Sequence, residues 1–273
     1  MLDEQTKISL RSRYNPDGSL LRRHQLCMLE MLLYFDEICK KHNIKYWICA
    51  GTLLGAIRHG GFIPWDDDLD VSMLREDFAR LEEIWDSSLY FLQTHKSDPF
   101  YVAPYAKMRD KRSLIKEGSQ QDLNYQYKGI YIDIFLVEPC PSVISKVLGI
   151  VNWRLLLFGS KVKSSLSKKV FLLLKKIQFA FIYVVRNVCS VFVDKNILRY
   201  SYGSGLSNYT VLSNQLFPLK EIFFEGYAFP TPANVEDYLS RTYGDYMQLP
   251  DLDKLHPHLT NISFIDSEND PHQ

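Results

Sequence analysis

Four carboxylates occupy five consecutive positions within the segment Ile63–Val71. Alternate side chains of an extended strand share one face, so we expect Asp68 and Asp70 to point together from one strand. Carboxylates held this close repel one another, and a fold tolerates the repulsion when a cation lies between them. Their hard oxygen atoms suit Mg²⁺, or Mn²⁺, that carries the phosphates of a substrate. The alternative is a solvated acidic turn after Pro64.

A glycine corner stands just upstream of these carboxylates. Residues Lys45–Ala50 suit a short strand, Gly51 follows, and Leu53–Arg58 predict a brief helix that Thr52 is able to cap. Glycine lets the backbone approach a phosphate closely, and the first turn of a helix offers N–H groups and a positive dipole end. Together with the acidic strand, this unit predicts a site for phosphoryl-type transfer.

A third carboxylate lies inside an apolar strand. Residues Gly129–Val137 alternate, with isoleucine or leucine at every second position and Asp133 on the other face. A lone aspartate in such a strand is costly unless something pairs with it. Two interpretations stay open: a satisfied carboxylate on an edge strand, or a third metal or base carboxylate beside Asp68 and Asp70.

Other candidates have weaker support. Asp66 and Asp67 are expected to orient the metal ligands. Four further side chains are candidates for holding phosphate charge: Arg58, His59, Lys107 and Arg109. The first two border the glycine corner and are equally well explained without a role. For the other two, the alternative is a solvated strand edge.

Periodicity predicts the helices that flank this core. Apolar residues recur at helical spacing over Leu20–Lys41, and again from Leu74 to Trp85. Asn234 has the pattern of a helix N-cap, and Gly244 is expected to end that helix after Tyr243. The five cysteines are widely spaced and form no Cys-x-x-Cys pair, so neither a disulfide framework nor a zinc site is expected.

The charge of the 273-residue chain is balanced overall but not locally. Lys plus Arg and Asp plus Glu number 32 each, whereas Ser142–Arg199 holds eleven basic residues against Asp194 alone, a net charge of +10. No nucleic-acid-binding motif accompanies this basic segment, so we expect no nucleic-acid partner. Its apolar runs, such as Ile177–Val185, are shorter than the about 20 residues of a spanning helix.

Apolar runs interspersed with lysine and arginine are typical of helices that lie on an anionic membrane surface. The alternative is a helical insertion packed on the core with a solvated basic face. The N-terminus has no apolar signal-peptide core. We therefore expect a cytoplasmic protein, peripherally associated with the inner face of the plasma membrane.

The stretch Ala50–Val71 resembles the signature of LicD-type phosphotransferases, which are similar to fukutin-related proteins and belong to the nucleotidyltransferase-fold superfamily. Ile132–Phe135, Phe224–Gly226 and Tyr243–Met247 continue the resemblance. The basic middle segment carries none of these motifs. After Leu249-Pro250, where a basic stretch is expected, the chain departs from the pattern.

The resemblance implies an α+β fold, with a nucleotidyltransferase-like mixed β-sheet core flanked by helices. Residues 1–140 would form the catalytic core, 141–200 a basic, largely helical insertion, and 201–273 a C-terminal segment that completes the catalytic domain. The implied sites are Gly51 and Thr52 on the phosphate turn and Asp68 and Asp70 as metal pair, with Asp133 as general base or further ligand.

The implied reaction is metal-dependent transfer of a phosphorylated alcohol or sugar, such as phosphocholine. The donor would be nucleotide-activated and CDP-linked, and the acceptor a hydroxyl of a surface glycan or its lipid-linked precursor. Two alternatives stay open: nucleotidyl transfer to a small molecule with release of pyrophosphate, and a non-catalytic membrane-bound scaffold.

Overall fold

The computed structural model of the chain describes residues 2–115, 124–204, 210–252 and 262–264. Its helices are α1 (Glu4–Tyr14), α2 (Leu20–Lys41), α3 (Ala50–His59), α4 (Arg75–Ile84), α5 (Ser142–Gly159), α6 (Ser165–Cys189), α7 (Ser213–Leu216) and α8 (Val235–Tyr243). Its strands are β1 (Tyr46–Ile48), β2 (Asp70–Leu74), β3 (Tyr90–Gln93), β4 (Ala106–Asp110), β5 (Ser113–Ile115), β6 (Tyr131–Pro139), β7 (Ile197–Tyr200), β8 (Val211–Leu212), β9 (Lys220–Phe224), β10 (Tyr227–Thr231) and β11 (Ile262–Phe264).

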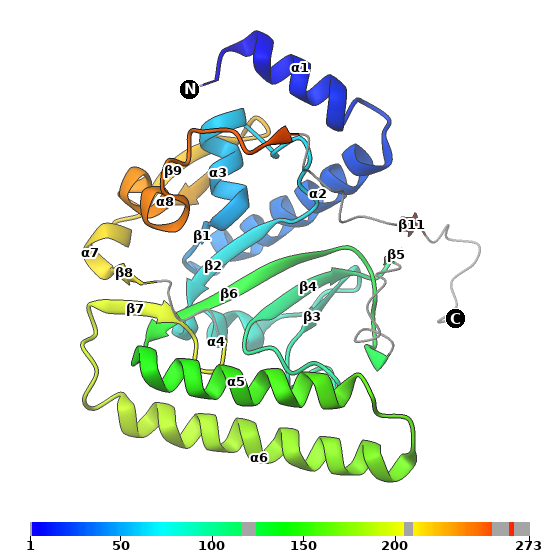
Figure 1. Ribbon diagram of the computed structural model, residues 1–273, viewed down its shortest axis with the longest axis vertical. Helices are drawn as coiled ribbons and strands as arrows, with labels where there is room; N and C mark the ends of the chain where they lie inside the picture. The colour runs from blue at the N-terminus through cyan, green and yellow to red at the C-terminus, as the bar shows by residue number, and fades with distance from the viewer. Residues whose placement is uncertain (1, 116–123, 205–209, 253–261, 265–273) are drawn as a thin grey trace.

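A mixed seven-stranded sheet forms the centre of the molecule (Figure 1). Its main order is β1-β2-β6-β4-β3, and β7 and β8 join beyond β4 on the same edge of β6. Strands β2 and β6 run parallel, whereas the other neighbouring strands are antiparallel. The expectation of a mixed sheet flanked by helices is confirmed. Because β6 has partners on both edges, the interpretation of Asp133 as an edge-strand carboxylate is wrong.

One face of the sheet is sealed by apolar packing. Ile132 and Ile134 of β6 are fully buried in one cluster with Met28, Leu32 and Phe35 of α2. Complete burial of one such side chain contributes about 1.5–3 kcal/mol. The predicted bounds of α2 are confirmed.

Helix α8 has the capping expected from its sequence. The side chain of Asn234 accepts a hydrogen bond from the backbone N–H of Asp237 (3.1 Å). At the other end, Gly244 lies at φ 68°, a conformation that favours glycine, and α8 ends before it. Both predicted boundaries are confirmed. All five cysteines are free, as expected.

The segment 142–189 folds as two long helices, which we call the α5–α6 hairpin. The two helices lie side by side along one side of the molecule, with α6 outermost (Figure 1). Lys175 of α6 donates hydrogen bonds to the carbonyls of Asp98 and Pro99 (2.8 Å each), and Arg186 pairs with Glu138 at the end of β6 (2.8 Å). The hairpin is therefore anchored to the core by charged groups as well as by apolar contacts.

His95 forms a further anchor of the hairpin. Its ring stacks on Phe179 of α6, with centroids 3.9 Å apart and planes at 3°. Burial and the nearby charges of Lys175, Arg75, Lys96 and Arg186 lower the pKa of His95 to about 3. Between that value and the ordinary histidine pKa, the unfolded chain binds more protons than the folded protein. The contribution of neutral, partly buried His95 to the free energy of unfolding is therefore complete above about pH 6.5 and is lost as the pH falls.

We expect acidification from pH 6.5 to 5 to cost at most about 2 kcal/mol of unfolding free energy at His95. Replacement His95→Phe keeps the aromatic contact but removes the titrating group, so it should flatten this part of the pH dependence. Urea unfolding of both proteins across this pH range measures the difference. Identical pH profiles for the two proteins would contradict the assignment.

Candidate active site

Asp70 and Asp133 lie directly opposite each other on the neighbouring parallel strands β2 and β6. The backbone N–H of Asp133 donates to the carbonyl of Leu69 (2.9 Å), which fixes this register at the start of β2. Leu69 and Val71 are buried, at 1% and 0% exposure. Since side chains alternate across a sheet, the two carboxylates project from the opposite face, beside each other.

Asp68 does not share a strand with Asp70, so that expectation is wrong. The strand begins at Asp70, and Asp68 is exposed in the preceding loop. Hydrogen bonds from side chains of α2, rather than strand pairing, hold this loop in place. Gln25 donates to the carbonyl of Asp66 (2.9 Å), and the His24 ring donates to that of Asp67 (2.8 Å).

The three carboxylates of the loop lie close to one another, although Asp70 and Asp133 are not part of that group. Carboxylate oxygens of Asp66, Asp67 and Asp68 lie within 4.8 Å of one another, which is suitable spacing for a shared cation. Burial and repulsion from Asp68 and Asp67 raise the pKa of Asp66 to about 7. Burial, followed by repulsion from Asp133, Asp68 and Asp66, holds the pKa of Asp70 well above its usual range. The two strand carboxylates and the acidic loop therefore belong to one electrostatic cluster.

Lys107 extends this cluster across the next strand. It lies opposite Asp133 in the register of β4 and β6, and its Nζ is 2.7 Å from Asp133 Oδ1. The two side chains are only 12% and 15% exposed, and Nζ lies 3.4 Å from the centroid of the Tyr131 ring. The alternative interpretation of Lys107 as part of a solvated strand edge is wrong. Its charge opposes the repulsion felt by Asp70.

Gly51 and Thr52 lie against the acidic cluster. Helix α3 begins at Ala50 with Cys49 as N-cap, so the prediction of a helix capped by Thr52 is wrong. The Thr52 hydroxyl instead accepts a hydrogen bond from the backbone N–H of Asp70 (2.8 Å), which joins α3 to β2. A Cβ at Gly51 would lie 2.9 Å from Asp66 Oδ2, so glycine is needed for the close approach of this carboxylate. The acidic cluster thus adjoins the first turn of α3.

The other predicted charge-binding residues have identified protein partners. Arg58 is buried and donates to the carbonyls of Tyr246 and Gln248 (3.2 Å each), while its Nε donates to the ring of His59 (3.0 Å). Burial, followed by the charge of Arg58, lowers the pKa of His59 to about 4. These contacts join the end of α3 to the segment after α8.

Arg109 is also buried, at 2% exposure. Its guanidinium donates to Gln93 Oε1 (2.6 Å) and to the carbonyl of Gly129 (3.1 Å), and it lies over the Tyr131 ring at 4.7 Å from the centroid. A solvated strand edge is therefore the wrong interpretation of this residue too. Its contacts support the sheet beside Asp133.

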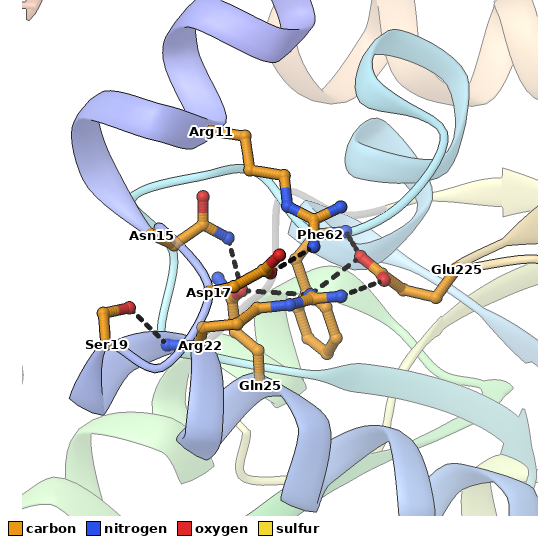
Figure 2. A network of polar contacts seen from close by, with 8 residues as sticks. All are labelled: Arg11, Asn15, Asp17, Ser19, Arg22, Gln25, Phe62 and Glu225. Atoms are coloured by element: carbon orange, nitrogen blue, oxygen red, sulfur yellow. Dashed lines mark hydrogen bonds and ion pairs between the residues drawn. The ribbon is translucent and has the colours of Figure 1, made fainter.

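Sequence reasoning did not identify the residues that hold the acidic loop in place. Figure 2 shows Arg22 of α2 reaching Glu225, in the turn between β9 and β10. The guanidinium donates to both carboxylate oxygens, at 3.2 and 2.6 Å, and Glu225 Oε1 also accepts from the backbone N–H of Phe62 (3.0 Å). Only the Phe224–Gly226 motif pointed to this turn. Nothing local distinguished Arg22 from a solvated helix residue.

Two tyrosines also lie near the cluster without having been predicted. Burial and the charges of Asp133 and Asp70 raise the pKa of Tyr105. Burial and the charges of Asp70 and Asp66 likewise raise the pKa of Tyr243, at the end of α8. Both phenols are therefore protonated and neutral near pH 7, with a hydroxyl that can donate a hydrogen bond.

The residues present fit a divalent cation. Asp70, Asp133 and the acidic loop supply the hard oxygen atoms that Mg²⁺ and Mn²⁺ prefer. Asp133 Oδ1 is buried and, despite its proximity to Lys107, accepts no hydrogen bond of suitable geometry from the described residues. A cation would satisfy this oxygen and relieve the repulsion that raises the pKa of Asp70.

Comparison with known sequences assigns the chain to a family. The sequence model described as the LicD/FKTN/FKRP nucleotidyltransferase domain matches residues 43–185. The chain belongs to the LicD family, and the predicted resemblance is confirmed. The matched range extends through α5 and most of α6, although the sequence motifs placed the basic segment outside the resemblance.

Individual relatives agree with this assignment. The chain is 31% identical to the lipopolysaccharide cholinephosphotransferase LicD of Haemophilus influenzae, over 90% of this chain and 98% of that protein. It is 38% identical to the human ribitol 5-phosphate transferase FKRP over 55 residues, which are 20% of this chain and 11% of that protein. The prediction of a LicD-like enzyme that transfers phosphorus-containing groups is confirmed.

Proposed function

We propose that this enzyme transfers a phosphorylated alcohol or sugar, such as phosphocholine, from a nucleotide-activated donor to a hydroxyl of a cell-surface glycan or its lipid-linked precursor. The observation that carries the proposal is the in-register pair Asp70–Asp133. The carboxylates of the acidic loop add to this pair and approach the first turn of α3. The names of the relatives support the class of group transferred, because those proteins are named for the transfer of choline phosphate and of ribitol 5-phosphate.

The reaction exchanges one phosphorus–oxygen bond for another. With CDP-choline as donor, the acceptor oxygen bonds to the choline-bearing phosphorus, the bridge to the second phosphate breaks, and CMP leaves. The acceptor hydroxyl gives its proton to a base. Asp133 is suited to that role or to metal ligation, since it is held between Lys107 and Asp70 on the face of the sheet opposite the buried Leu69 and Val71.

A divalent cation, when bound, would neutralise the negative charge on the transferring phosphate. In this proposal Asp70 and Asp133 hold the cation, with Asp68 as a further ligand and Asp66 and Asp67 in support. The remaining residues position these groups. Thr52 fixes the start of β2 through the Asp70 amide, and Gly51 leaves room for Asp66.

The phosphates of the donor would lie by the first turn of α3, whose N–H groups favour anions. Lys107 pairs with Asp133 of this acidic pair and would lie beside the phosphate. Arg58, His59 and Arg109 act through their protein contacts in this proposal. They hold the segment after α8 and the sheet, so their loss would misplace the site rather than remove a phosphate contact.

The products distinguish this reaction from nucleotidyl transfer. We expect CMP to accumulate from CDP-choline only when Mg²⁺ or Mn²⁺ and a glycan acceptor are both present, with phosphocholine recovered on the acceptor by mass spectrometry. Chelation with EDTA should stop the reaction, and omission of the acceptor controls for simple hydrolysis. Release of pyrophosphate from a nucleoside triphosphate, with no turnover of any CDP-linked donor, would instead establish the nucleotidyltransferase alternative.

A further inference from the structure

The outer face of α6 carries an apolar stripe along the whole helix. Its members recur every three or four residues and are 41–72% exposed: Leu166, Val170, Leu173, Ile177, Phe181, Val184 and Val188. The opposite face supplies the buried residues Phe171, Lys175, Gln178 and Ile182, so the stripe faces away from the core. Exposed apolar surfaces this continuous mark interaction sites.

Neighbouring parts of the hairpin expose further apolar residues. On α5, Val147, Ile150 and Trp153 are 56%, 60% and 57% exposed. In the turn after α6, Val191 and Phe192 are 75% and 83% exposed. Trp153 is informative because tryptophan is enriched where a protein meets the headgroup region of a bilayer.

Basic side chains border these apolar surfaces. Lys169 and Lys176 are exposed on α6, each one residue before a member of the stripe, and Lys146 and Arg154 are exposed on α5. No acidic residue occurs in residues 142–189. Long basic side chains can lay their stems along an apolar surface while their charged ends reach phosphate groups.

We propose that the α5–α6 hairpin seats the enzyme on an anionic lipid bilayer, with the apolar stripe in the interface and the flanking lysines on lipid phosphates. The positive charge of the hairpin favours an anionic membrane over a second copy of the chain as the partner of this surface. Two copies of this hairpin facing each other would bring two strongly positive surfaces together, whereas an anionic leaflet attracts them. This inference concerns location and does not depend on which group the enzyme transfers.

The hairpin lies on the bilayer rather than crossing it. Among the described helices, α5 alone has the length and composition of a membrane span. However, Asn152 in the middle of α5 donates to the carbonyl of Gly203 (3.0 Å) and accepts from Gln178 of α6 (3.2 Å). These bonds hold one face of α5 against the rest of the protein.

Lys175 differs from the neighbouring lysines because its side chain binds the protein core. It is buried and holds the carbonyls of Asp98 and Pro99, and its burial lowers its pKa to about 8. Neutralising it would loosen the hairpin rather than test lipid binding. The electrostatic test therefore uses Lys169→Gln with Lys176→Gln, and the apolar test uses Leu173→Gln with Phe181→Gln.

The experiment measures co-sedimentation of the full-length protein with phosphatidylcholine vesicles, with and without phosphatidylglycerol. We expect binding to the anionic vesicles, weakened at least about tenfold by the lysine pair and at least about tenfold by the apolar pair. Matched controls are Lys41→Gln with Lys220→Gln, and Phe223→Gln, which change exposed residues of the same kinds elsewhere. The controls should bind like the parent protein, and transfer to a water-soluble acceptor should be unchanged in all variants.

Three outcomes would overturn the proposal. One is vesicle binding that neither pair of substitutions weakens. Another is a dimer in sedimentation equilibrium that the apolar pair dissociates, without vesicle binding by the parent, because the stripe would then join two copies. The third is resistance of cell-membrane-bound protein to both high salt and alkaline carbonate, which would indicate a spanning helix.

Discussion

The replacement Asp70→Asn lowers metal-dependent turnover by at least about 10²-fold while leaving the metal-free protein at least as stable as the parent. Asparagine keeps the shape of the side chain but removes a charged ligand, and losses of this size follow removal of one preorganised electrostatic contact. The stability expectation comes from the raised pKa of Asp70, because burial and three neighbouring carboxylates disfavour its charged form. Initial rates and thermal unfolding with and without Mg²⁺ measure both effects.

The control for this result is Asp86→Asn, which changes an exposed aspartate outside the cluster and should alter neither activity nor the Mg²⁺-dependent rise in melting temperature. Asp133→Asn is expected to differ from Asp70→Asn. It leaves the poorly exposed Lys107 ammonium without its carboxylate, so stability should fall together with activity. Full turnover in Asp70→Asn would refute the metal assignment.

Glu225→Gln lowers the free energy of unfolding by about 3 kcal/mol and reduces activity as well. The Arg22 and Glu225 side chains are only 8% and 15% exposed, so the substitution leaves a nearly buried guanidinium without its charge partner. It also weakens the acceptor for the Phe62 amide, which helps to hold the loop leading to the acidic residues. Urea unfolding and initial rates of the same preparations give the two readouts.

The exposed pair Arg11–Asp17 provides the comparison. Its side chains are 50% and 86% exposed at a similar distance, so Asp17→Asn should cost less than about 1 kcal/mol. The double variant Arg22→Met with Glu225→Gln should lose less stability than the two single losses added together, since neither charge is then left alone. A cost for Glu225→Gln no greater than that for Asp17→Asn would show that the pair does not stabilise the loop.

Features that depend on local periodicity and local chemistry could be predicted from the amino-acid sequence. Helix α2, the alternation of β6 and the caps of α8 follow from side-chain spacing, because the helical and extended backbones impose their own periods on nearby residues. The acidic run and the glycine corner likewise identified the place of the site and, through the resemblance, the family.

Which of these residues contact one another depends on long-range packing of the folded chain. The pairing of Asp70 with Asp133 depends on the parallel register of β2 and β6, whose partners are 63 positions apart in the sequence, and no local pattern specifies that register. The bond between Arg22 and Glu225 joins positions 203 residues apart. Similarly, spacing predicted an extended strand through Asp68, whereas side chains from α2 hold those residues as a loop, because contacts distant in sequence outweigh local preference.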